Sequence, residues 1–176
     1  MLQETHLNED HLNNIKSCFN KNFEIFNSCD PDNPCGVVGV AIILNKAYIA
    51  PEMVQIHVLT QGRAIMMKLK WAGTEELLII SIYAPNRARQ HLAFWTQLDQ
   101  ERRRKRLLRL DFVAGDFNLT EDLIDRDPPT ESDIAAIEAL RVARLTWNTQ
   151  DQWCHDNPNG RLFTHKHISD HEFKFA

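Results

Sequence analysis

The order of apolar and polar residues along the chain predicts a set of short strands. Positions 63–71 alternate, which is typical of a half-buried antiparallel strand. One face of that strand would carry Ile65, Met67, Leu69 and Trp71, and the other Ala64, Met66, Lys68 and Lys70. Positions 77–82 and 111–114 are apolar runs that predict central strands of a sheet. Further strands are expected at 36–44 and 54–60.

Helical spacing of apolar residues predicts three helices. Asn8 is a suitable N-cap for a helix over 9–23, and a second helix is expected over 88–110, after Pro85. A third helix would begin near Ser132. The expected apolar positions are Leu12, Ile15 and Phe19 in the first helix, Leu92, Trp95 and Leu98 in the second, and Ile134, Ile137, Leu140 and Val142 in the third. Strands and helices in this order predict an α/β sandwich of two packed sheets.

Composition bounds the class of protein without naming a function. The 176 residues predict one domain over 1–176, and 43% hydrophobic with 25% charged residues is ordinary for a globular chain. The net charge of -4 gives no global basic field, but a metal site can still recruit phosphate locally. The longest apolar stretch, around 77–83, is far too short to cross a membrane. No membrane contact and no obligate protein partner are therefore expected.

The cysteines indicate a reducing compartment. Cys18, Cys29, Cys35 and Cys154 have no CxxC spacing, and the chain starts with polar residues rather than a signal peptide. We therefore expect reduced thiols in an intracellular protein, nuclear or cytoplasmic and not secreted.

The strongest candidate for chemistry is the segment Gly115-Asp116-Phe117-Asn118. Residues two apart in an extended chain point the same way, so Asp116 and Asn118 would face one spot while Phe117 turns into the core. Gly115 would let a bulky group come close to the backbone. A carboxylate beside an amide suits a hydrated metal and a phosphate. The same four residues also make a good turn, which is the alternative interpretation.

Other motifs agree with the first interpretation. Gln3-Glu-Thr-His6, Gly62-Arg-Ala-Ile-Met-Met-Lys-Leu-Lys-Trp71, Tyr83-Ala-Pro-Asn86 and Gly115-Asp-Phe-Asn118 occur in this order. In order and spacing the chain resembles the endonuclease/exonuclease/phosphatase superfamily, and in particular the endonuclease domains of non-LTR retrotransposons. The resemblance covers nearly all of the chain. It implies a deoxyribonuclease I-like fold, a four-layer α/β sandwich of two packed mixed β-sheets flanked by helices.

The resemblance also implies roles for five residues. Glu4 would be the carboxylate that binds Mg²⁺ or Mn²⁺, and Asp116 would orient and deprotonate the attacking water. Asn118 would bind the phosphate or hold Asp116, Tyr83 would lie at the phosphate, and Asn86 would support the site. Judged from the residues alone, Glu4 could instead be a solvated carboxylate and Tyr83 a core residue with a satisfied hydroxyl.

Two parts of the family pattern have no counterpart, namely the first strand and the C-terminal strands. Phe163-Thr-His165 is followed at once by Ser169-Asp170-His171, which is either the terminal catalytic motif, with Asp170 and His171 as its members, or a chance match. We expect the chance match. The expected function is a Mg²⁺-dependent phosphodiester hydrolase that acts on DNA as an endonuclease. The alternatives are an inactive remnant of such a domain and a phosphatase of the same superfamily.

Three charged groups have plainer explanations. We expect Asp122, Asp125 and Arg126 to form a structural ion pair rather than part of the site. The basic run 102–106 spans more than one helical turn, so a solvated surface is expected rather than a DNA groove. His165, His167 and His171 have no cysteine pair beside them, which makes a zinc site the weaker interpretation.

Overall fold

The structure is a computed structural model that describes residues 1–36, 38–71, 75–107, 109–125, 133–160, 166–169 and 172–175. Contacts divide the chain into two compact units. The first unit contains Met1–Ala84 and Gln97–Phe117, and the second contains Pro85–Thr96 and Asn118–Ala176. The expectation of one domain over 1–176 stays a prediction.

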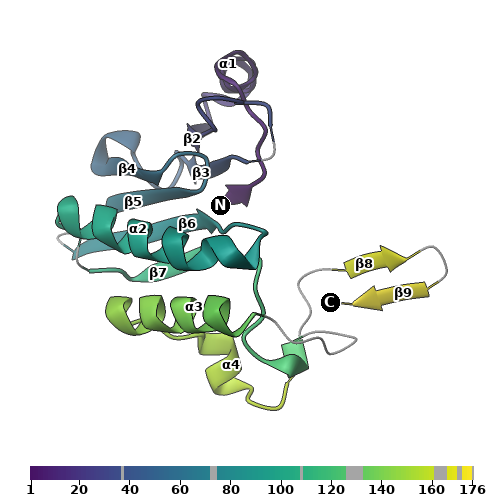
Figure 1. Cartoon of the computed structure of the whole chain (residues 1–176). Coiled ribbons are helices and arrows are strands. Elements are labelled where there is room, and N and C mark those ends of the chain that lie inside the picture. The colour runs from purple at the N-terminus through teal and green to yellow at the C-terminus, as the bar shows by residue number, and fades with distance from the viewer. Residues whose placement is uncertain are drawn as a thin grey trace. The chain divides into compact units, whose positions relative to one another are not determined.

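The first unit contains two β-sheets (Figure 1). The smaller sheet is antiparallel, in the order β1-β3-β2, and is formed by β1 (Leu2–Gln3), β2 (Phe23–Ser28) and β3 (Val40–Asn45). The larger sheet has the order β4-β5-β6-β7, with β6 and β7 parallel and the other neighbours antiparallel. Its strands are β4 (Val54–Thr60), β5 (Ala64–Trp71), β6 (Glu75–Tyr83) and β7 (Phe112–Asp116). One sheet is therefore mixed, and the other is antiparallel rather than mixed.

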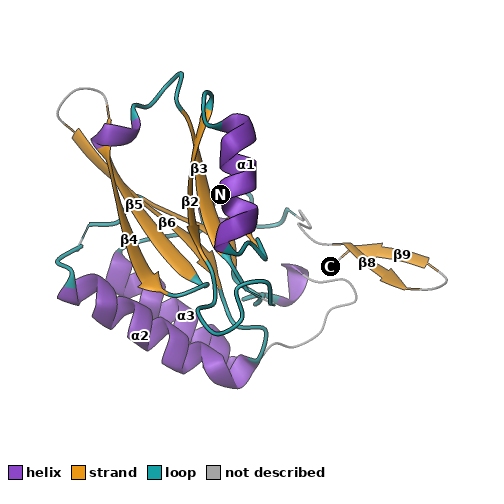
Figure 2. Cartoon of the chain, turned by 90° about the horizontal axis from the view of Figure 1, so that it is seen from above, coloured by secondary structure: helices purple, strands orange, loops and turns teal. Residues whose placement is uncertain are grey.

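The two sheets pack face to face through one hydrophobic core. Alternate residues of β3 and of β5 face each other in this core, as the period of a strand requires. Its buried members are Val38, Val40, Ile42, Leu44, Ile65, Met67, Leu69 and Tyr83. Helix α1 (Glu9–Phe19) lies against β2 (Figure 2), and α2 (His91–Arg104) is divided between the two units after Thr96. The predicted sandwich of packed sheets flanked by helices is confirmed.

The first helix is shorter than its sequence pattern predicts. Asn8 caps it as expected, because its Oδ1 accepts a hydrogen bond from the backbone N–H of His11 at 2.8 Å. The helix ends at Phe19 rather than at position 23, since Phe23 begins β2 and pairs with Asn45 of β3. Phe23 continues the helical spacing of Phe19, so only pairing with a distant strand reveals where the helix stops.

Two strand predictions need correction. Ala64 and Met66 are both 0% exposed, so the first half of β5 is buried on both faces, while Trp71 at its end is 53% exposed. Strand β7 is not central, because among the described residues it pairs with β6 alone and forms an edge of the larger sheet. Phe112 of β7 is accordingly exposed.

The basic run at the end of α2 is not uniformly solvated. Arg102 is only 2% exposed, and its guanidinium donates to the Leu107 carbonyl at 2.8 Å and to Asp99 Oδ1 at 3.0 Å. Arg103 and Arg104 are exposed and pair with Asp99 and Glu101 within the helix. Arg102 therefore holds the chain that leaves the helix toward β7, and only the following arginines fit the expected solvated surface.

The second unit is built around helix α3 (Ile134–Trp147). Asp133 caps its start by accepting from Ala136 N–H at 3.0 Å, and Asn148 ends it in a left-handed conformation with φ of 54°. Its buried residues are Ala136, Ala139, Leu140, Ala143 and Trp147. Trp147 packs edge-on against Trp95, with ring centroids 6.0 Å apart. The small alanines let α3 approach its neighbours closely.

Some apolar residues of the second unit do not face inward as expected. Ile134 and Val142 of α3 and Leu92 of α2 are 81%, 52% and 63% exposed. Helical spacing alone does not fix which of several apolar residues meets a neighbouring element. The remaining described elements here are η2 (Ala88–Gln90), η3 (Leu123–Asp125), α4 (Gln152–Asp156), β8 (Lys166–Ser169) and β9 (Glu172–Phe175). No helix among the described residues is long and apolar enough to span a membrane.

Candidate functional site

The candidate site begins where two parallel strands end. Strands β6 and β7 run parallel with Tyr83 opposite Asp116, and the backbone N–H of Ala84 donates to the Asp116 carbonyl at 2.8 Å. The carboxyl ends of both strands therefore lie side by side at the same end of the larger sheet. Registered residues of neighbouring strands carry their side chains on the same face. Asp116 consequently shares the face of the sheet on which Tyr83 lies.

Gly115 makes this approach of the two strands possible. Its φ of 149° is a conformation that residues with a side chain rarely adopt. A Cβ atom at this position would lie 1.9 Å from the carbonyl oxygen of Ile82 in β6. The backbone of the neighbouring strand therefore comes close to Gly115, and the approach of a ligand to this glycine stays a prediction.

Glu4 meets Tyr83 although the two residues lie far apart in the sequence. Strand β1 pairs with β3, and the Gln3 amide donates to Ser81 Oγ of β6 at 3.3 Å. The next residue, Glu4, accepts a hydrogen bond from the Tyr83 hydroxyl, with 2.5 Å between Oη and Oε1. Tyr83 is 2% exposed, whereas Glu4 is exposed. Tyr83 is therefore a core residue whose hydroxyl is satisfied by the candidate metal ligand.

The second unit brings together the two candidate amides. Asn118 Nδ2 donates to Asn86 Oδ1 at a long 3.5 Å. Asn118 has φ of 48°, so the strict alternation expected through Asp116 and Asn118 stops at the end of β7. Each amide follows a strand of the site closely in the chain, because Asn86 lies three residues after Tyr83 and Asn118 two residues after Asp116.

Two of the candidate residues, Glu4 and Asn118, have a positive φ angle. Five described residues other than glycine have positive φ. Arg106 and Asn148 follow the ends of α2 and α3, where such conformations are common. The other three are Glu4, His6 and Asn118, with φ of 51°, 49° and 48°. Conformations of this kind cost free energy and persist mostly where the surrounding structure imposes them, often at functional sites.

Metal ligands are few among the described residues of the site. Among the residues that the structure describes, no three His, Cys, Asp or Glu side chains are placed to hold an ion. Mg²⁺ keeps several waters and uses one or two carboxylates together with substrate phosphates, which an exposed carboxylate such as Glu4 suits. Asp170 and His171, and the side chains of His165 and His167, lie outside the described residues.

Carboxylates elsewhere in the second unit have structural explanations. Glu121 forms ion pairs with Arg144 and, at 3.7 Å, with Arg141 of α3. Burial, followed by the nearby Asp122 carboxylate, raises the pKa of Asp125. The predicted ion pair with Arg126 involves a residue outside the described ones. The ion pairs of Glu121 were not expected, because the sequence does not show which helix its carboxylate meets.

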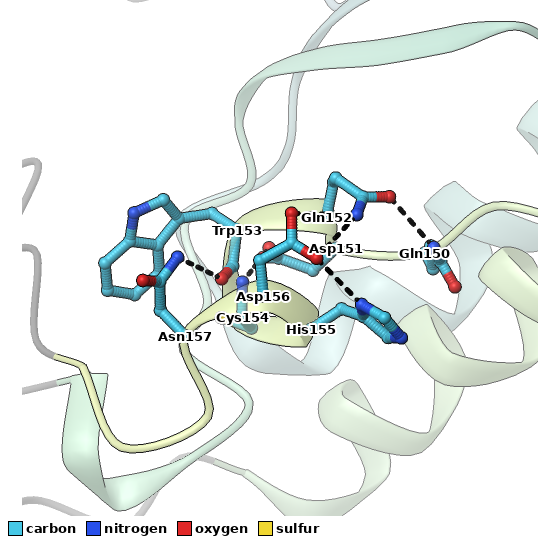
Figure 3. A network of polar contacts seen from close by, with 8 residues as sticks. All are labelled: Gln150, Asp151, Gln152, Trp153, Cys154, His155, Asp156 and Asn157. Carbon is cyan, nitrogen blue, oxygen red and sulfur yellow. Dashed lines mark hydrogen bonds and ion pairs between the residues drawn. The ribbon is translucent and has the colours of Figure 1, made fainter.

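Helix α4 carries a polar network that is local to the helix (Figure 3). Asp151 caps it by accepting from Cys154 N–H at 2.9 Å, and the Gln152 amide donates to Asp156 at 2.9 Å, one turn later. The Gln152 hydrogen bond, and after it that of His155, lowers the pKa of Asp156. Burial, and then Asp151, raises the pKa of the Cys154 thiol to about 11, so the thiol stays protonated at neutral pH.

Comparisons with known proteins agree with the fold. No family model matches the sequence. The chain is 26% identical over 136 residues to the transposon TX1 uncharacterized 149 kDa protein of Xenopus laevis; the match covers 77% of this chain and 10% of that protein. The chain is similar in structure to the endonuclease domain of TRAS1, a telomere-specific non-LTR retrotransposon, with a TM-score of 0.56 and 14% identity. That similarity covers 88% of this chain and 63% of the TRAS1 domain.

The fold is therefore that of a deoxyribonuclease I-like endonuclease domain. The two proteins named above, one similar in sequence and one in structure, come from transposable elements, and the second is a non-LTR retrotransposon endonuclease domain. The resemblance that the motifs indicate is thus confirmed at the level of fold. The roles of Glu4, Tyr83, Asn86, Asp116 and Asn118 stay predictions.

Proposed function

We propose that the chain is a Mg²⁺-dependent phosphodiester hydrolase that cuts DNA as an endonuclease. The observation that carries this proposal is the hydrogen bond from the buried Tyr83 hydroxyl to the exposed Glu4 carboxylate, at the sheet edge where Asp116 ends β7. The retrotransposon endonuclease fold and the transposon relative support nucleic acid as the substrate. Because the formal net charge is -4, the protein as a whole does not attract DNA. Local binding of the phosphate at the site is therefore more important for DNA binding than the overall charge.

In the proposed mechanism Glu4 holds Mg²⁺ or Mn²⁺, and the Tyr83 hydroxyl fixes the orientation of its carboxylate. An ion held there would supply positive charge that polarises a phosphate oxygen and offsets the negative charge of the transition state. The Asp116 carboxylate orients a water molecule and accepts its proton as the water oxygen bonds to phosphorus. The bond from phosphorus to the leaving sugar oxygen breaks, its electron pair stays on that oxygen, and the oxygen takes up a proton from solvent water. Asn118 donates to a phosphate oxygen, and Asn86 holds the Asn118 amide in place.

The test is nicking of DNA by the unmodified chain. We expect conversion of a supercoiled plasmid to the open circle, and cleavage of a duplex with one abasic site, in Mg²⁺ or Mn²⁺. Ca²⁺ should support little cleavage, since it takes more oxygen ligands in a looser geometry than Mg²⁺. Addition of EDTA should abolish the reaction, and excess Mg²⁺ should restore it. Cleavage that persists in EDTA would contradict the metal dependence.

The same assay decides against the inactive alternative. If neither Mg²⁺ nor Mn²⁺ supports cleavage of either DNA by the folded chain, the domain is a remnant without hydrolytic activity on DNA. Circular dichroism on the same sample shows whether the chain is folded. Release of inorganic phosphate from a phosphomonoester, without any nicking, would instead identify a phosphatase.

A further inference from the structure

We propose that Arg63 is a positioning residue that holds the Tyr83 hydroxyl on Glu4 and, through it, tunes metal binding. The inference rests on the proposed function for the part that concerns the metal. Arg63 follows the turn between β4 and β5 and is half-buried. None of the candidate roles described above includes it.

Arg63 contacts Tyr83 in three ways. Its guanidinium carbon lies 5.3 Å from the centre of the Tyr83 ring, within the range of a cation–π interaction. Its Nη1 donates to the Tyr83 carbonyl at 3.3 Å, and its own carbonyl accepts from Tyr83 N–H at 2.8 Å. Ring and backbone of Tyr83 are thus both held by one residue. With the ring fixed, the position of the hydroxyl oxygen beside Glu4 is fixed as well.

The turn at Gly62 and Arg63 also supports the segment that carries Glu4, which accepts the hydrogen bond from Tyr83. Gly62, directly before Arg63, accepts from Gly39 N–H at 3.0 Å, and the Gly39 carbonyl accepts from Thr5 N–H at 3.2 Å. Thr5 follows Glu4, whose backbone has a positive φ of 51°. A Cβ atom on Gly39 would lie 2.4 Å from Thr5 Oγ1, so the contact is close. The turn at Gly62 and Arg63 therefore connects to both Glu4 and Tyr83.

A positioning role differs from a purely structural one in what it does to the hydroxyl. Arg63 is fork-shaped and binds a ring face and a carbonyl at once, which glutamine cannot do and lysine does only in part. Residues that orient a metal ligand commonly change metal affinity by about 10-fold to 100-fold when they are replaced. Arg63→Gln should therefore change both the environment of the Tyr83 hydroxyl and the response to Mg²⁺.

The experiment uses the full chain labelled with ¹³Cζ-tyrosine, because the chain has only two tyrosines. Tyr48 is 85% exposed and serves as the internal reference. In the otherwise unmodified protein Glu4→Gln should shift the Tyr83 signal and leave that of Tyr48 in place. In the Arg63→Gln background Glu4→Gln should no longer shift the Tyr83 signal. An equal shift in both backgrounds would overturn the proposal, whatever the nuclease activity is.

Titration with Mg²⁺ adds a second readout on the same samples. The Tyr83 signal should respond to Mg²⁺, and Arg63→Gln should raise the concentration at half response about tenfold. The double variant Arg63→Gln/Tyr83→Phe should nick DNA as slowly as Tyr83→Phe alone, because Arg63 acts through Tyr83. If the double variant nicked DNA more slowly than Tyr83→Phe by the full loss that Arg63→Gln causes alone, Arg63 would not act through Tyr83.

Control variants distinguish a failure of the Arg63 proposal from misfolding and from a failure of the proposed function. Arg103→Gln removes another arginine, one that is exposed on α2, and should leave both tyrosine signals and nicking unchanged. Arg63→Lys keeps the charge and should retain part of the Glu4 effect, and it replaces Arg63→Gln if the latter does not fold. Failure of the unmodified chain to nick DNA would refute the proposed function. The shift of Tyr83 on Glu4→Gln would still decide the role of Arg63.

Discussion

Gly115→Ala is expected to lower the free energy of unfolding by about 3 kcal/mol or more. An added Cβ would lie 1.9 Å from the Ile82 carbonyl oxygen, and alanine would have to adopt φ of 149°. Movement of a side chain cannot relieve either problem, because the clash is with the backbone of β6, which is paired with β7 on both sides of Gly115. Thermal melts followed by circular dichroism measure the effect.

The matched control is Gly160→Ala in the second unit. A Cβ atom there would come within 3.0 Å of the Trp153 ring, which can move, and Gly160 does not have a positive φ. Its effect should be small, within about 1 kcal/mol. Equal melting temperatures for Gly115→Ala and the unmodified protein would show that β6 and β7 are not paired as described.

The second large effect is expected in catalysis. Asp116→Asn should slow nicking about 100-fold or more, because the amide keeps the shape of the carboxylate but cannot accept the proton of the attacking water. The variant should melt at nearly the same temperature as the unmodified protein, since the side chain is exposed and the backbone hydrogen bond from Ala84 to its carbonyl is kept.

Asp32→Asn is the control for this substitution, because Asp32 is an equally exposed aspartate in the loop after β2. It should nick DNA at the rate of the unmodified chain. His171→Ala should also have little effect if Ser169-Asp170-His171 is a chance match to the terminal motif. Full nicking activity in Asp116→Asn would refute the proposed general base.

The sequence predicts strands β3 to β7 because an alternation of apolar and polar residues or an apolar run is visible in each. Val54–Thr60 is found at its predicted bounds, and β5 and β6 within two residues of theirs. What it misses depends on pairing between distant segments. Strand β2 (Phe23–Ser28) carries no clear alternation and forms because each of its residues pairs with β3. The edge position of β7 likewise depends on neighbours that its own apolar residues do not reveal.

In the candidate site, too, the residues that a local motif marks were predicted, and those that depend on contacts between distant segments were missed. The motifs identify Glu4, Tyr83 and Asp116, and the structure pairs Tyr83 with both of the others, by a side-chain hydrogen bond and by strand register. Arg63 was not identified, although it lies in the Gly62–Trp71 stretch that carries the resemblance. Its contact with Tyr83 joins positions 20 apart, and no local spacing encodes it. Arg102 was missed because a run of like charges hides the one buried member.

The most direct test of the account is the nicking rate of Glu4→Gln compared with that of Glu52→Gln, at one fixed Mg²⁺ concentration. Both glutamates are exposed, but only Glu4 receives the Tyr83 hydroxyl. We expect Glu4→Gln to nick supercoiled plasmid about 100-fold more slowly, and Glu52→Gln to match the unmodified chain. Raising Mg²⁺ or supplying Mn²⁺ should recover part of the loss in Glu4→Gln. Equal rates for the two variants would contradict the assignment of Glu4 as the metal ligand and with it the proposed site.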